Sequence, residues 1–402
     1  MTETSSVFGL RHQARCLTAV TSSIEKSKFL AGTVGAKDNA IYLLEYNDDT
    51  MAITPTLYNH PEEIWDIVSC PTDENLLFTS HSPGITPFVV LKKCIFVDNK
   101  RCVNLKVSGN PLKRKATLWR KPGMDLEGKE DNDQRHDLTC MVTLENEGVK
   151  KQEQSQEIIS IDSNKIYLSS LDDTSTAQTS LVIDVSSTFS KESDAPSLRQ
   201  LQNAVWNPHG AELITVGDCN LSGWDLRSGK NSFNRCQAHK STIRAVDYNP
   251  NKPYHVVTGG DDAKVYIWDI RQLKEPILDV GQEEDSHSHW IWSVAFNSLQ
   301  DQLLLTSSSD NLVNLHNVVS VSAASYLDSS SEDEKDVQSD DYGRSTNKPT
   351  DGLIYTYDQH EDSVYKVAWS PADTWTFASI SYAGRVVISQ VPTNEKFKIL
   401  GV

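Results

Sequence analysis

The chain has 402 residues, of which 38% are hydrophobic, and a formal net charge of -17. This length fits a single all-β propeller, because propellers use several hundred residues as one domain. The acidic balance disfavours general nucleic-acid binding, which needs a basic surface to displace counterions.

Cysteine usage and hydropathy indicate a cytoplasmic protein. The cysteines form no CxxC pair and no zinc-ligand spacing, so we expect reduced thiols and no structural metal. They are Cys16, Cys70, Cys94, Cys102, Cys140, Cys219 and Cys236. The N-terminus lacks a signal-peptide pattern, and the apolar stretch 87–97 is too short to cross a bilayer. We therefore expect only peripheral membrane association, through partners.

The N-terminal half predicts three blades. Strands are expected at 14–20, 28–35 and 39–47 for the first blade. A second blade opens at 60–71 and closes at 116–120. The third is expected from strands between 139 and 187.

The C-terminal half shows a clearer repeat of about 40 to 50 residues, a period typical of propeller blades. The repeats lie at 204–227, 239–271, 287–317 and 360–389. Each reads as an apolar strand, a turn, a second strand, a polar turn and a third strand. The sequence therefore predicts an all-β, seven-bladed WD-repeat β-propeller, a single monomeric domain over 1–402.

Three segments are predicted to lie outside the blades. Residues 84–116 form an insertion in blade 2 that, with its flank to Lys121, holds ten bases and one acid. Residues 121–137 are a polar loop. Residues 321–352 hold eight acids and three bases without a strand pattern, which predicts disorder before blade 7. The basic insertion suggests contact with anionic lipid, or a passive loop. Ser329, Ser330 and Ser331 precede acids and could be phosphorylated, or belong to a passive linker.

A recurring polar set links the repeats: a loop His, a strand Ser or Thr, a turn Asp and a third-strand Trp. In WD repeats these side chains form a hydrogen-bonded chain within each blade, which satisfies buried polar groups. The candidate members are His239, Thr258, Asp262, Trp268, His287, Thr306, Asp310, His360, Ser379, Asp218 and Trp224. The repeat at 239–268 has all four. His316, Ala383 and Ser389 replace members of the later repeats.

Catalytic motifs such as GxSxG, a P-loop, GxGxxG and HExxH are absent from the sequence. His287 and His289 could be metal ligands, but His287 already occupies the relay position. Asp261 and Asp262 could be an acid–base pair, but in this context they form a turn. We therefore expect no catalysis, no cofactor, no metal and no small-molecule substrate.

A candidate partner-binding site comes from alignment of the first strands. In four repeats the loop His is followed by an apolar residue at the start of the first strand, and the next residue is large and aromatic or basic. These next residues are Trp65, Arg244, Trp292 and Tyr365. We call these four residues the collar, because equivalent positions in different blades should surround one mouth of the channel. Trp, Tyr and Arg dominate binding hot spots. If the collar binds a partner, Ala at Trp65 and Trp292 should abolish capture with little change in thermal stability; otherwise these side chains pack between blades.

Two WDxR sequences support an alternative. Arg227 and Arg271 each end such a motif. It resembles the element by which substrate receptors dock onto a cullin-type ubiquitin ligase, although the same dipeptide also simply ends the third strand of a blade.

The order of motifs resembles one WD-repeat family. The succession EIWDIVSCP, GWDLRS, SHWIWSVAFN, LLTSSSD, the acidic interruption and HEDSVYKVAWS resembles the interacting protein of the endosome-associated recycling (EARP) and Golgi-associated retrograde (GARP) complexes. The resemblance implies a non-enzymatic partner of these tethers. It would act at the trans-Golgi network and early or recycling endosomes, in endosomal recycling, retrograde transport, and dense-core vesicle maturation and cargo sorting.

Overall fold

The computed structural model describes residues 5–35, 37–71, 73–82, 102–106, 115–121, 135–137, 139–144, 156–162, 164–171, 177–186, 201–280, 286–323 and 350–400. Strands dominate these ranges. The short 3₁₀ segment η3 (Val319–Val321) follows β25, and helix α1 (Thr393–Leu400) follows the last strand. The predicted all-β class is confirmed.

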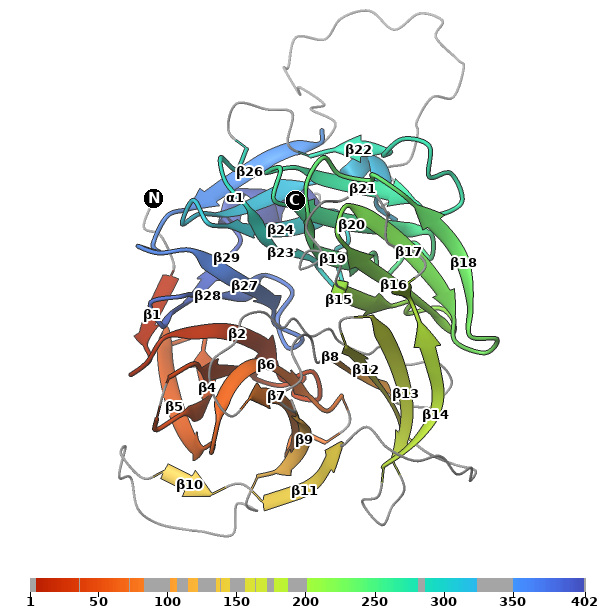
Figure 1. Cartoon of the computed structure of the whole chain (residues 1–402). Coiled ribbons are helices and arrows are strands. Elements are labelled where there is room, and N and C mark those ends of the chain that lie inside the picture. The colour runs from red at the N-terminus through yellow and green to blue at the C-terminus, as the bar shows by residue number, and fades with distance from the viewer. Residues whose placement is uncertain are drawn as a thin grey trace, which may run out of the picture.

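The described strands form seven sheets around a central axis, and six of these sheets contain four antiparallel strands (Figure 1). Each blade is given from its innermost strand outward. The first blade consists of β2 (Ala14–Ala19), β3 (Ser27–Thr33), β4 (Ala40–Asn47) and β5 (Ala52–Asn59). The second blade consists of β6 (Glu63–Ser69), β7 (Leu76–Ser82), β9 (Lys115–Arg120) and β11 (Thr139–Leu144). In the same direction, two more consist of β15 (Leu201–Trp206), β16 (Glu212–Gly217), β17 (Asn220–Asp225), β18 (Lys230–Arg235), and of β19 (Ile243–Tyr248), β20 (His255–Gly260), β21 (Val265–Asp269), β22 (Leu278–Asp279). The last two consist of β23 (Ile291–Phe296), β24 (Leu303–Ser308), β25 (Val313–Asn317), β26 (Gly352–Tyr357), and of β27 (Val364–Trp369), β28 (Thr376–Ser381), β29 (Arg385–Gln390), β1 (Ser5–Gly9).

The remaining sheet is irregular. It contains β8 (Cys102–Lys106), β12 (Gln156–Asp162), β13 (Lys165–Leu171) and β14 (Ala177–Asp184). β8 pairs parallel to β12, whereas neighbouring strands in a regular blade are antiparallel. The prediction of seven regular blades is therefore corrected: the described residues form six blades of four antiparallel strands and one sheet of different construction.

The structure also corrects the limits of three predicted segments. β8 lies inside the insertion predicted at 84–116, and β9 begins at Lys115. β10 (Arg135–Asp137) lies inside the polar loop predicted at 121–137 and pairs parallel to β5. β11, predicted for the third blade, pairs with β9 in the second.

Five further strands and a helix were missed, and two hypotheses cannot be placed. The missed elements are β1, β5, β18, β22, β26 and α1. Of the acidic segment 321–352, residues 324–349 lie outside the described ranges, as do Ser329, Ser330 and Ser331. Most of the basic insertion lies outside them too. Lys121, in its flank, is buried, and burial lowers the pKa of this side chain to about 8.

The core lies between the sheets, because each sheet stacks face to face on its neighbours. Val205 and Ile214 of one sheet pack with Ile243 and Trp268 of the next. Close approach between sheets requires a glycine at one repeated position. A Cβ on Gly259 would lie 2.6 Å from Ile291 Cγ2 of the next sheet, so only glycine fits there without rearrangement.

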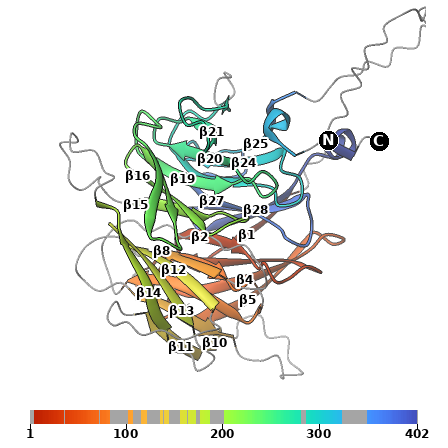
Figure 2. The same cartoon turned by 90° about the vertical axis from the view of Figure 1, so that its right-hand side faces the viewer.

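The ring closes through the first described strand. β1 pairs antiparallel with β29 over Ser5–Gly9 and Arg385–Ser389, so the two ends of the chain complete one blade. Figure 2 shows β1 beside the strands of this last blade. This closure protects the edge of β29, since an unpaired edge strand would expose its backbone groups.

Candidate functional site

Within the β19–β22 sheet, four side chains form one hydrogen-bonded relay. Nδ1 of His239 lies 2.9 Å from the Asp262 carboxylate, and Nε2 lies 2.7 Å from the Thr258 hydroxyl. The indole N–H of Trp268 donates to the same hydroxyl at 2.9 Å. A neutral imidazole that donates from Nδ1 accepts the hydroxyl proton at Nε2, so every group has a partner.

The neighbouring relays are less complete. In the β23–β26 sheet, His287 contacts Asp310 at 2.9 Å and Thr306 at 2.8 Å. His316 replaces the tryptophan and lies 3.1 Å from the Thr306 hydroxyl. Burial lowers the pKa of His316 to about 3, so this imidazole is neutral.

The relay of the β15–β18 sheet has no histidine. Trp224 donates to the Thr215 hydroxyl at 2.9 Å. Asp218 lies in the β16–β17 turn with φ of 52°, and its carbonyl accepts the N–H of Ile243 at 2.8 Å. Its carboxylate accepts from the thiol of Cys219 at 3.6 Å. Asp218 therefore connects two blades through its backbone, while its side chain serves its own turn.

Sequence reasoning missed a relay in the second blade. His60 lies 3.0 Å from the Thr79 hydroxyl, to which Trp119 donates at 2.8 Å. Nδ1 of His60 lies 2.8 Å from the carbonyl oxygen of Glu62. The signal was present in the loop histidine, but the insertion separates Thr79 from Trp119 by 40 residues instead of the usual ten.

We predict that Thr258→Val destabilises the fold by about 2 kcal/mol or more, because the indole N–H of Trp268 and the imidazole of His239 lose their shared partner in a buried site. Thr258→Ser keeps the hydroxyl and should lose less. Urea unfolding of both variants measures the difference. Equal losses would show that the hydroxyl contributes nothing beyond packing.

The last relay lacks its acid. His360 Nε2 lies 2.7 Å from the Ser379 hydroxyl, and Nδ1 is buried with no hydrogen-bond partner among the described residues. Ala383 stands where the relays of His239 and His287 have Asp262 and Asp310. Burial, and secondarily the charge of Arg385, lowers the pKa of His360 to about 4.

We predict that Ala383→Asp stabilises the fold by about 1 kcal/mol, because a carboxylate would accept the Nδ1–H of His360. The pKa of His360 should rise above about 4. Thermal unfolding and NMR titration measure the two effects. In a His360→Phe background the gain should vanish, and a gain that persists there would rule out this explanation.

The innermost strands of the six regular blades share a β-bulge near their start. In β2 the pairing passes from Ala14 to Cys16, which leaves Arg15 as the extra residue. The extra residue of each blade is Arg15, Trp65, Gln202, Arg244, Trp292 or Tyr365. Bulges redirect a side chain from its normal position. All four members of the predicted collar are therefore bulged residues, and Arg15 and Gln202 were missed because no loop His precedes them at the usual spacing.

Five of the six bulged residues, all except Gln202, form a continuous series of contacts between rings and guanidinium groups. The Arg244 guanidinium lies 5.0 Å from the ring centre of Trp292, which stacks on Tyr365 at 4.6 Å. The Arg15 guanidinium lies 5.2 Å from the ring centre of Tyr365 and 5.1 Å from that of Trp65. Cation–π contacts of this kind hold the side chains in fixed orientations.

Arg244 is neutralised within the site. Its Nε and Nη2 donate to the two carboxylate oxygens of Asp261 at 2.8 and 2.7 Å. Asp261 and Asp262, the adjacent carboxylates of the sequence, are thus directed to different partners, Arg244 and His239. This geometry gives each a specific structural contact.

The collar residues differ in exposure. Trp65 is buried, at 7% exposed, which favours the alternative that its side chain packs between blades; truncation of a buried tryptophan costs about 3–5 kcal/mol. Trp290, which sequence reasoning missed, is 43% exposed and packs edge-on against Trp292 at 6.1 Å. Trp290 therefore offers the accessible aromatic surface of this mouth.

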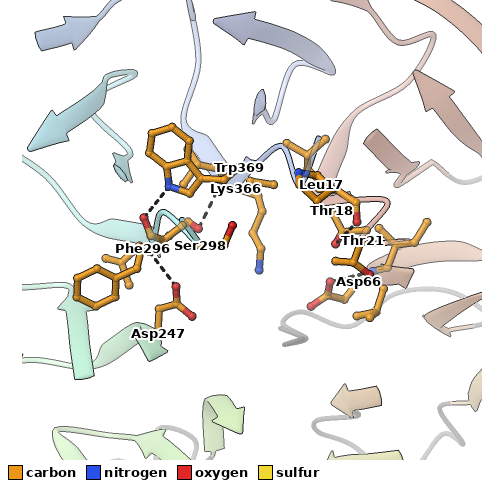
Figure 3. A pocket seen from close by; sticks show the side chains of 18 residues that line it. Leu17, Thr18, Thr21, Asp66, Asp247, Phe296, Ser298, Lys366 and Trp369 are labelled. Carbon is orange, nitrogen blue, oxygen red and sulfur yellow. Dashed lines mark hydrogen bonds between the residues drawn. The ribbon is translucent and has the colours of Figure 1, made fainter. Parts of the chain in front are cut away.

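A small cavity lies further along the same inner strands (Figure 3). Its volume is about 110 Å³, below the roughly 300–1,000 Å³ of small-molecule sites. Lys366 extends into it between Asp66 and Asp247 (Figure 3). Asp247 accepts the N–H of Phe296 at 3.0 Å. A wider, open groove of about 850 Å³ runs beside β22.

The two WDxR arginines follow the ends of the third strands β17 and β21, away from the bulged residues at the start of the innermost strands. The surface formed by these strand ends and by β22 is called the outer rim. The Arg271 guanidinium pairs with Asp269 at 2.6 Å and lies 4.2 Å from the ring centre of Tyr254. Arg227 is exposed, and its backbone N–H donates to Asp225 at 3.0 Å. Both positions follow a third strand, as the motif requires.

Membrane spans and metal clusters are both absent from the described ranges. No helix in them has the length and apolar character that a bilayer crossing requires. No group of three or more His, Cys, Asp or Glu in them is placed to hold a metal ion.

The stacked antiparallel sheets, their relays and their shared bulges define a WD-repeat β-propeller. Residues 352–388 match the WD domain, G-beta repeat model, and residues 2–173 and 150–316 match the EIPR1 beta-propeller model. The chain belongs to the EIPR1 β-propeller family.

Curated relatives agree with this assignment. The chain is 34% identical to "EARP and GARP complex-interacting protein 1" of Homo sapiens over 400 residues, which cover 98% of each chain. It is 34% identical to "EARP-interacting protein homolog" of Danio rerio, also over 98% of each chain. It is 29% identical to "WD repeat-containing protein DWA2" of Arabidopsis thaliana over 96% of this chain and 95% of the relative.

Proposed function

We propose that this chain is a non-catalytic scaffold that binds multisubunit vesicle-tethering complexes of the EARP and GARP type. The names of its relatives state such an interaction for those proteins. The observation that carries the proposal is the stack at the channel mouth, where Trp290 adds exposed aromatic surface to collar residues that are already held in place. Preorganised aromatic and arginine side chains are typical of binding hot spots.

The cellular role follows from this partner. A monomeric cytoplasmic propeller would associate peripherally with the trans-Golgi network and early or recycling endosomes through the tether. There it would support tether recruitment, endosomal recycling, retrograde transport, and dense-core vesicle maturation and cargo sorting. We also infer that the irregular sheet serves as a seventh blade, since β8 contacts both β6 and β15.

The ubiquitin-ligase alternative has less support. Docking through WDxR needs an available arginine, and the Arg271 guanidinium is already paired with Asp269 and stacked on Tyr254. The alternative therefore rests on the exposed Arg227 alone.

We predict that Trp290→Ala weakens binding to a purified EARP complex about 10-fold or more without lowering thermal stability, because an exposed hot-spot ring is lost. Tyr254→Ala is the matched control: Tyr254 is 44% exposed, against 43% for Trp290, and lies on the outer rim. Biolayer interferometry with the full chain measures both affinities.

The proposal would be contradicted if Tyr254→Ala weakened binding and Trp290→Ala did not. Affinity purification from cells gives a second criterion. Recovery of a cullin-ligase adaptor in place of tether subunits, lost on substitution of Arg227 and Arg271, would establish the alternative.

A further inference from the structure

Arg15 occupies an aromatic cage at the channel mouth. Its guanidinium carbon lies 4.8 Å from the ring centre of Tyr382, 5.1 Å from that of Trp65 and 5.2 Å from that of Tyr365. Trp65 lies on β6, Tyr365 on β27 and Tyr382 directly after β28. Three separate segments thus hold one cation, which fixes its position before any partner arrives.

Arg15 and Arg244 differ in whether a carboxylate balances their positive charge. Arg244 is neutralised by its paired bonds to Asp261. Within the described ranges, no carboxylate forms an ion pair with Arg15, and its Nε is buried without a hydrogen-bond acceptor. The face of an aromatic ring attracts the positive charge of a guanidinium. The N–H donors of the guanidinium point outward in its own plane, however, and the rings provide no hydrogen-bond acceptor there.

Glu63 is the carboxyl group whose pKa the charge of Arg15 affects. That charge lowers the pKa of Glu63, while burial raises it by more. In the part of the chain that the structure describes, the two side chains form no ion pair. Among the described residues the Arg15 guanidinium thus has no hydrogen-bonded acceptor, which is unfavourable for its buried Nε. The side chain as a whole is half-buried, so a partner would bind it through the two Nη atoms and not through Nε.

The charged residues of the channel behind the mouth affect which ligand charge is favoured there. Asp66 and Asp247 face a single Lys366 in the cavity further along the strands (Figure 3). Because these formal charges sum to −1, an anion is disfavoured deeper in the channel and favoured at Arg15. A ligand with a carboxylate would therefore bind at the rim and stop there.

We propose that Arg15 is the anion anchor of the channel mouth: it binds a carboxylate of an acidic segment of the protein partner. This inference rests on the proposed function and specifies the chemistry that the partner presents. The planar guanidinium matches a planar carboxylate through two parallel N–H···O bonds. Trp292, which stacks on Tyr365, and Trp290, which packs against Trp292, would cover the apolar residues of the same segment.

We expect Arg15→Gln to weaken binding to a purified EARP complex about 30-fold, the size of a hot-spot loss. Arg15→Lys should lose less, since it keeps the charge but not the fork. Arg271→Gln is the matched control, because it removes one positive charge from the outer rim. Thermal unfolding of each variant shows whether the fold is retained.

A zero-length cross-link then identifies the bound group. The lysine amine introduced by Arg15→Lys forms an amide with a carbodiimide-activated carboxylate within reach, with loss of the activated oxygen as a urea. Mass spectrometry should find position 15 joined to an acidic residue of a tether subunit. Wild-type chain, with arginine there, should give no such product.

Several outcomes would overturn the inference. If Arg15→Gln binds like wild type while Trp290→Ala is weakened, the anchor is wrong and the docking surface stands. If neither variant is weakened, both proposals fail. A cross-link to residues 324–349 of this chain, or loss of Arg15-dependent binding after phosphatase treatment of the complex, would assign the anion to another source.

Discussion

The fold depends on a buried hydroxyl that serves two rings. In the β19–β22 sheet, the Thr258 hydroxyl is hydrogen-bonded to both His239 and Trp268. The other ring nitrogen of His239 is hydrogen-bonded to Asp262. Each group would be costly to bury alone, because an unpaired polar atom in a core loses its contacts with water. Joined together, they fix the loop, two strands and the turn of a blade in one arrangement. Each described relay imidazole lies within its own sheet, so the relays do not converge on a common catalytic centre.

The relays do not involve the bulged residues at the start of the innermost strands, so these positions can differ from blade to blade. Because loops and turns are held within each blade, the start of the innermost strand can accommodate a bulge whose extra residue takes no part in the ladder. The same bulge in six blades places Arg15, Trp65, Arg244, Trp292 and Tyr365 in one connected set. A structural repeat thus generates a surface in which the side chains differ from blade to blade and the backbone does not.

The sequence predicted the parts of the molecule in which spacing is the same from one repeat to the next. The relays at His239 and His287 follow from a separation of 23 residues between imidazole and acid. Prediction weakened where insertions interrupt that spacing. Trp119 was not assigned to the relay of His60, and β11 was placed in the wrong blade, because strand pairing across a long insertion has no local signature.

The site was predictable in position but not in composition. Four of its members followed from the loop His, whereas Arg15 has none and became visible only through its bulge. Exposure was not predictable either, because packing between sheets decides it: Trp65 is buried and Trp290 is not. The parallel pairing of β8 was equally inaccessible, since no sequence pattern distinguishes a parallel from an antiparallel partner for a single strand.

Hydrogen exchange of the full chain, alone and bound to a purified EARP complex, tests the central claim most directly. Slow exchange is expected in β19–β21 in both states, because the relay braces that sheet. Added protection on binding is expected at 286–292, 360–366 and 382–384, the segments of the channel mouth. Protection confined to the outer rim at 225–230 and 269–279, with none at the mouth, would contradict the account.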